Sequence, residues 1–280
     1  MTSATSSQAA HPTAHSNTTA PRAASLRRLR ALSRAEMRQF TRNPLLVITA
    51  LLFPVALPLF VWIVGDQSVG STDSASEIFV LLALGFGIFY PALSMTVTRR
   101  DEEVLKRLRT GEARDWEILT SIALPLAATM LLLSVLMVAG LSTLSMFLPL
   151  DPPVAHVWPV NALLMALAMV LGIVCSHAVA ILTSSFTANA ENAQITSMPV
   201  LMLLMFSQSS LRSALPDALG QVLDATPFAP AVDIVRAGWI GDGSFASVFA
   251  DSSTDLIKLA AWTVALVWAA HKYMRWNTHR

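Results

Sequence analysis

ILTSIALPLAATMLLLSVLMVAGLSTLSMFLPL, residues 118–150, is a run of 33 residues without a charged side chain. An α-helix needs about 20 apolar residues to cross the hydrocarbon core of a bilayer. A run of this length and composition therefore predicts a membrane-spanning helix.

The rest of the chain repeats this pattern. Charge-free runs also cover residues 43–65, 78–98, 152–190 and 192–211, and the chain as a whole is 54% apolar and only 13% charged. Soluble domains carry about a quarter charged residues. A weaker apolar segment, 256–274, has Lys258 in its first turn and aromatic residues toward its ends. We therefore predict an all-α polytopic membrane protein with six transmembrane helices.

Basic residues are distributed unevenly around these runs. Seven Arg precede the first run, six Lys or Arg lie within 99–117, and three follow the last span, whereas the loops 65–77 and 148–158 have none. By the positive-inside rule, both termini and 99–117 are cytoplasmic, in a multi-pass protein of the cell (plasma) membrane. We expect residues near Asp73, Asp151 and Asp242 outside, and a segment of short external helices over 212–255 that dips toward the membrane.

Two segments precede the six-span region, which covers 44–280. Residues 1–24 are rich in Ser, Thr and Ala and predict a disordered cytoplasmic tail. Residues 25–43 separate apolar from Arg side chains at helical spacing and predict an amphipathic interfacial helix on the inner membrane surface. Glu36 falls on its apolar face, where it either reaches out to the interface or meets a basic partner.

A charged loop, RRDEEVLKRLRTGEARDWE (residues 99–117), holds 12 charged residues among 19. Its acids precede its bases, which suits a helix dipole and allows Glu102–Lys106 and Glu103–Arg107 pairs. Val104, Leu105 and Leu108 leave a narrow apolar stripe. The loop is therefore either a short helix that docks on a soluble protein or a solvated loop with the usual positive bias.

Several function classes lack their chemistry in this sequence. The spans carry His177 but no central acid, which argues against a secondary transporter. No catalytic set, metal-ligand set or phosphate-binding loop is present, so we predict no catalytic residue, no metal site and no cofactor on this chain. Nothing indicates binding of nucleic acid. Any ATP would be used by another protein.

Four stretches carry a resemblance to a known family, and the first of them, residues 38–44, resembles the run-in to that family's first span. LKRLRTG (105–111) resembles the LKRLRxTP stretch after the second span of ABC type-2 (ABC-2) export permeases, with Gly111-Glu112-Ala113 in place of the usual Pro. AENAQ (190–194), followed by Pro199, resembles the entry to the fifth span. PFAP (227–230) with VRAGW (235–239) resembles the external PxxP…xRxGW segment. These matches occur in the family's order between Leu26 and Arg280.

The resemblance implies a fold like that of type V ABC exporters. Residues 25–43 would be the connecting helix and 99–117 the coupling loop, with a smaller contact between spans four and five. Two identical permeases would form a homodimer, and this dimer would pair with two cytoplasmic ATPase subunits that bind ATP and Mg. We expect the apolar stripe to pack in a groove of the ATPase with charges at its rim. The expected coupling residues are Glu36, Arg38, Glu102, Glu103, Val104, Leu105, Arg107, Leu108, Arg109 and Glu191.

In that family, spans two and five face each other across the dimer axis. The residues expected to line a substrate cavity are Phe86, Phe89, Tyr90, Met198, Met202, Met205 and Phe206. Methionine and aromatic side chains adapt to varied apolar ligands, which favours export of a hydrophobic or amphiphilic small molecule or lipid. The alternatives are a non-transporting membrane protein, such as a sensor or assembly subunit, and a membrane-embedded enzyme.

Overall fold

The computed structural model describes residues 21–65, 69–110, 114–143, 158–240, 244–274 and 276, and every regular element in these ranges is helical. The expected tail over 1–20, residues 111–113 of the charged loop and most of the 148–158 loop lie outside the described residues. Residues 21–24 belong to the first helix, α1 (Pro21–Arg42), which therefore begins four residues before the predicted amphipathic helix.

Five helical segments of the described chain are long and apolar enough to cross a membrane, which confirms an all-α polytopic fold. The first is Pro44–Val64, formed by α2 (Pro44–Val47), the π-helical η1 (Ile48–Leu52) and α3 (Phe53–Val64). The second is Gly70–Asp101, formed by α4 (Val69–Leu82), the π-helical η2 (Ala83–Phe89) and α5 (Tyr90–Asp101). The others are α7 (Asp115–Thr143), α8 (Ala162–Phe186) and α14 (Ser253–Tyr273).

The predicted fifth span is shorter than expected. The charge-free run 192–211 yields α9 (Ala193–Phe206), which has only 14 residues, followed by α10 (Ser209–Ala214). The Ser207 hydroxyl donates to the Leu203 carbonyl at 2.8 Å, a bond that competes with helix continuation. Absence of charge alone could not reveal this early end.

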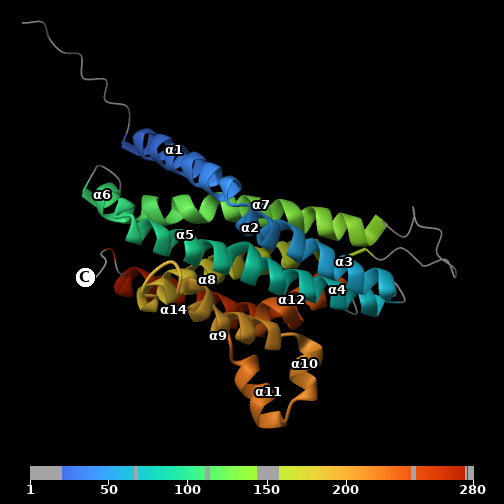
Figure 1. Ribbon diagram of the computed structural model, residues 1–280. Coiled ribbons are helices and arrows are strands. Elements are labelled where there is room, and N and C mark those ends of the chain that lie inside the picture. Colours follow the sequence, from blue (N-terminus) through green and yellow to red (C-terminus); the bar gives the residue numbers. More distant parts are fainter. Residues whose placement is uncertain are drawn as a thin grey trace, which may run out of the picture.

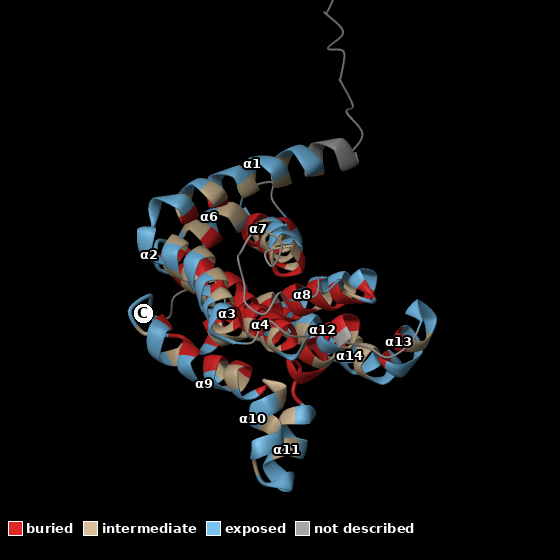
Figure 2. Cartoon of the chain, turned by 90° about the vertical axis from the view of Figure 1, so that its right-hand side faces the viewer, coloured by how far each residue is buried: buried red, intermediate tan, exposed pale blue. Residues whose placement is uncertain are grey.

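The second span forms the centre of the bundle and is the most buried of the five segments. Figure 2 shows buried residues concentrated along α4, α8 and α12 (Ala229–Ile240). Close packing depends on small residues: a Cβ on Gly87 would lie 2.1 Å from Met130 Sδ of α7. The α7 helix can approach the second span here because position 87 has no side chain.

Helix α1 (Pro21–Arg42) crosses over α7 at one end of the bundle, the end that also carries α6 (Val104–Thr110) and the end of α14 (Figure 1). We call this the charged-loop end and the opposite one the outer end. The predicted amphipathicity is confirmed, since Phe40 is buried and most of the Arg side chains are exposed, although Leu26 is exposed as well. Asn43 then caps α2 by accepting from the Leu46 amide at 3.2 Å.

The external segment contains two different arrangements. α10 and α11 (Asp217–Asp224) project sideways from the bundle (Figures 1 and 2). By contrast, α12 packs between α4, α8 and α14, and most of its described side chains are buried. α13 (Phe245–Asp251) then leads into α14. Within this segment, α12 is thus the helix that enters the bundle.

The expected outer loop over 65–77 requires a correction. The helix resumes at Val69, so Asp73 and Glu77 lie within α4 and are buried. The reason is that both acids have polar partners on α10 and α12, described below, which allow them to remain inside the bundle.

Candidate coupling site

Glu36 is buried on the face of α1 that packs against the bundle, and its side chain is fully inaccessible to solvent. Its carboxylate forms an ion pair with the guanidinium of Arg99, at the end of α5. Arg99 also donates to Gln39 Oε1 at 2.7 Å, so one guanidinium holds two successive turns of α1. The sequence allowed Glu36 either to reach out to the interface or to meet a basic partner, and in the structure it meets the basic partner Arg99.

The environment of Glu36 has an electrostatic consequence. Burial raises the pKa of this carboxyl from its ordinary value of 4.5 to about 7, while the charge of Arg99 and its hydrogen bond oppose the rise. The group therefore changes its protonation state near neutral pH, and the ion pair exists only when it is ionised.

Glu117 provides a second buried connection between α1 and the bundle. It lies in the first turn of α7 with no solvent exposure, and accepts from the Ser25 hydroxyl and from Arg28 Nε at 3.4 Å. It also accepts from the Arg114 amide at 3.0 Å, which is the backward bond of a capping box. One carboxylate thus caps α7 and ties the beginning of α1 to it.

Helix α6 is anchored by Leu105, and here the prediction of a docking stripe needs correction. Leu105 is fully buried in a cluster of this chain's own residues that includes Ile118 of α7, Ile181 of α8 and Met274 after α14. It therefore is not available to a groove on a partner. The stripe faces inward because three helices of the same chain end beneath it and bury it.

The other expected coupling residues of the loop divide by exposure. Val104 and Leu108 are half-buried, whereas Glu102, Glu103 and Arg107 are exposed. The side chain of Arg109 lies outside the described residues. Glu103 has a φ of 56°, a left-handed conformation that costs a residue with a Cβ about 1 kcal/mol or more. This residue turns the chain sharply from α5 into α6.

Arg100 and Asp101 join the charged loop to the segment between α8 and α9. Arg100 Nη1 donates to the Ser184 carbonyl at 2.6 Å, and Nη2 donates to the carbonyls of Thr187 and Ala188. A cation at this position satisfies the free carbonyls at the C-terminus of α8. Asp101 Oδ2 accepts from the Ala190 amide at 2.8 Å.

These contacts bring together most of the residues expected for coupling. The turn that carries exposed Glu191 is held directly beside the end of α5, next to the exposed acids of the charged loop. Arg38 lies on the exposed face of α1. Sequence reasoning missed Arg99, Arg100 and Glu117, although their place where charge meets an apolar span was a usable signal, because such charges must find partners.

The residues expected around a substrate cavity are more dispersed. Phe86, Tyr90 and Met205 are half-buried, while the α9 residues Met198, Met202 and Phe206 are exposed. Phe89 is fully buried in the chain's own core, which differs from its expected position on the facing surface. The physical reason is the π-helical η2, whose wider turn rotates Phe89 away from the face that a regular α-helix would give it.

Polar contacts also gather at the outer end. Asp73 Oδ2 lies 3.0 Å from Arg236 Nε of α12, and Glu77 Oε2 accepts from the Ser209 amide at 3.2 Å. The guanidinium of Arg212 pairs with Asp224 and Asp233. These bonds attach α4 to α10 and α12, and Arg212 joins the start of the external segment to its later helices.

The sequence profile of the ABC-2 type transporter family matches residues 27–239. The chain belongs to that family. No curated protein matches the chain. The match begins within α1 and ends at Trp239 of α12, so it includes the buried pairs at the charged-loop end and the Arg236 contacts at the outer end. This ABC-2 type protein is thus a multi-pass membrane permease subunit of an ABC transporter, a family that works with ABC ATPase partners.

Proposed function

We propose that this ABC-2 type permease exports a hydrophobic or amphiphilic small molecule or lipid. In the proposed assembly two identical copies pair in the plasma membrane, with both termini in the cytoplasm. Two separate ATPase subunits bind ATP and Mg and dock at the charged-loop end.

The observation that carries the proposal is the way this end is joined together. α1, α5, α7 and the 187–192 turn are connected through Glu36, Arg99, Arg100 and Glu117, all buried. An element that must transmit a displacement has to be fixed to the helices it moves. Buried charge pairs resist separation because a lone buried charge is costly.

The charged-loop end also carries exposed charges, which belong to Glu102, Glu103, Lys106 and Arg107. Charges at the edge of an interface guide and orient a partner, although each contributes little affinity. We assign recognition of the ATPase to these charges and assign to Leu105 the fixing of α6 to the bundle.

The proposed substrate class rests on the α9 side of the molecule. Met198, Met202 and Phe206 are exposed on α9, and Phe86 contacts Phe53 of α3 edge to face, with ring centroids 5.1 Å apart. An uncovered face rich in methionine and aromatic rings suits an apolar ligand or a second copy of the chain.

The docking proposal is tested by charge reversal. Glu102→Lys with Arg107→Glu is expected to reduce ATPase co-purification and ATP-driven uptake of a lipophilic fluorescent dye by inside-out vesicles. The matched control is Asp255→Lys with Lys258→Glu, which exchanges an exposed pair 2.9 Å apart on α14. If both double variants retain the ATPase equally, the charged loop is not the docking surface.

Pairing of two copies is tested by cross-linking. Met202→Cys should form a disulfide between copies, whereas Val264→Cys on α14 should not, although Val264 is exposed to a similar degree. The native Cys175 is buried and stays out of the reaction. Equal cross-linking of the two variants contradicts the proposed pairing through α9.

A further inference from the structure

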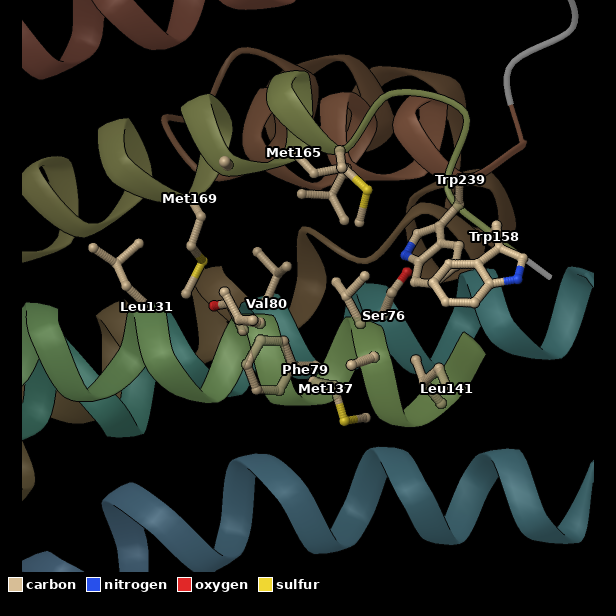
Figure 3. A pocket seen from close by; sticks show the side chains of 17 residues that line it. Ser76, Phe79, Val80, Leu131, Met137, Leu141, Trp158, Met165, Met169 and Trp239 are labelled. Atoms are coloured by element: carbon tan, nitrogen blue, oxygen red, sulfur yellow. The ribbon is translucent and has the colours of Figure 1, made fainter. Parts of the chain in front are cut away.

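A cavity of about 350 Å³ lies between the outer halves of α7 and α8, with α4 and α12 behind it (Figure 3). Its walls are apolar and include Phe79 and Val80 of α4, Leu131 of α7, and Met165 and Met169 of α8. Ligand sites in proteins measure roughly 300–1,000 Å³, so this space is large enough to hold part of a small molecule.

The position of the cavity limits what can enter it. Along α8 it extends from Ala162 to Met169, a depth of about 10 Å at 1.5 Å per residue. It lies between two segments that are each long and apolar enough to span a bilayer. Trp158 and Trp239 mark its outer end, at the level where α8 begins. The cavity is therefore at the depth of the upper part of lipid acyl chains.

One polar group in the wall has no partner. The hydroxyls of Ser76 and Ser134 donate to backbone carbonyls at 2.8 and 2.7 Å, and Trp158 is exposed. Trp239 Nε1 is buried, with only 2% of the side chain exposed, and has no hydrogen-bond partner among the described residues. Figure 3 shows the indole nitrogen of Trp239 on the side of the ring that faces Ser76 and the cavity.

The local packing keeps this indole in place. A Cβ on Gly238 would lie 2.3 Å from Met165 Cγ, and the Gly238 carbonyl accepts from the Asn161 amide at 3.0 Å. Arg236, two residues earlier, is paired with Asp73. Arg236 and Gly238 thus fix α12 to α4 and α8, and the N–H of Trp239 is held in the wall without a hydrogen-bond partner among the described residues.

We propose that this cavity binds one acyl chain of an ester-linked membrane lipid, whose ester carbonyl oxygen accepts a hydrogen bond from Trp239 Nε1. The ligand needs a hydrocarbon part that fills an apolar space and one acceptor at its outer end. A glycerolipid has both, since its ester carbonyls lie at the interface, where tryptophan N–H groups are commonly found. The site is separate from the α9 face of the proposed substrate path and requires no ATPase.

The test compares two lipids on the purified permease, with bound lipid counted by native mass spectrometry. The probes are a diacyl phosphatidylethanolamine and its dialkyl ether analogue, which lacks the carbonyl oxygens but keeps the chains and headgroup. A neutral hydrogen bond is expected to favour retention of the ester lipid by roughly two- to tenfold. Trp239→Phe should remove this preference because it deletes the N–H and keeps an aromatic ring.

A second pair of variants tests the cavity itself. Ala166→Phe places a ring in the cavity. The number of lipids that remain bound to the permease should then fall by one. Leu163→Phe is the control, because Leu163 is exposed on the same helix and does not line the cavity. Equal retention of ester and ether lipid by the wild type, or full retention by Ala166→Phe, overturns the proposal. The wild-type comparison needs no variant, so a folding defect cannot obscure it.

Discussion

The ion pair between Glu36 and Arg99 allows a quantitative prediction. Arg99→Met removes the cation and leaves a carboxyl with no solvent exposure, whereas Arg38→Met removes an exposed cation from the same helix α1. Breaking a buried pair by removing one partner costs about 3–5 kcal/mol, and loss of an exposed charge costs under about 1 kcal/mol. At this chain length the difference corresponds to a fall of roughly 10 °C in melting temperature.

The pH dependence gives the prediction a sign. Glu36 has a pKa of about 7 in the folded chain against an ordinary 4.5, so the folded state holds a proton that the unfolded state releases between these values. Stability from this group is therefore present at low pH and is lost as pH rises through 7. Only the ionised form of Glu36 pairs with Arg99. At one pH unit above the pKa, ionised Glu36 is favoured over protonated Glu36 by about 1.4 kcal/mol. Arg99→Met should thus destabilise more at pH 8 than at pH 6.

The assay is the temperature at which detergent-purified permease loses its monodisperse elution profile, measured at both pH values. The double variant Glu36→Met with Arg99→Met should recover most of the loss, because two apolar side chains replace the pair. The reasoning is refuted if Arg99→Met and Arg38→Met have the same melting temperature. It is also refuted if the double variant is as unstable as Arg99→Met alone.

Three further predictions use the same stability assay, and each has its own comparison. Glu103→Gly should leave stability unchanged or raise it by about 1 kcal/mol, because glycine accepts the positive φ, whereas Glu102→Gly at an ordinary φ should lower it; the opposite order would contradict a strained turn. Leu105→Ala should cost about 2–5 kcal/mol because it empties a fully buried site, and a neutral result would show that α6 is not anchored there. Gly238→Ala should destabilise through its clash with α8, while Gly140→Ala, with open space around it, should stabilise α7 by about 0.5–1 kcal/mol; equal effects would count against the close contact.

Hydropathy and charge predicted the spans because both follow from transfer of side chains into the bilayer, which depends little on neighbours. The amphipathic helix and the need of Glu36 for a partner were predictable for the same reason. The identity of Arg99 as that partner was not, since it depends on how α1 crosses the bundle. Leu105 was placed on the wrong side because a stripe shows which face is apolar and does not show what covers it.

Local backbone geometry accounts for the other differences. The rotation of Phe89 comes from a π-helical segment, and nothing in the 3.6-residue period announces one. Asp73 and Glu77 were assigned to a loop because acids usually end a span, yet Arg236 and Ser209 keep them inside α4. Such partners come from α10 and α12, more than 100 residues away in the chain.

The short helix α9 has a consequence for the surrounding membrane. Its 14 residues rise about 21 Å, whereas a bilayer core is about 30 Å thick, and every ångström of mismatch costs a fraction of a kcal/mol. The lipid next to α9 must thin, or α10 and α11 must fill the remaining depth. Turnover in reconstituted vesicles should therefore depend on acyl-chain length, and equal turnover in thin and thick bilayers would show that α10 and α11 fill the remaining depth.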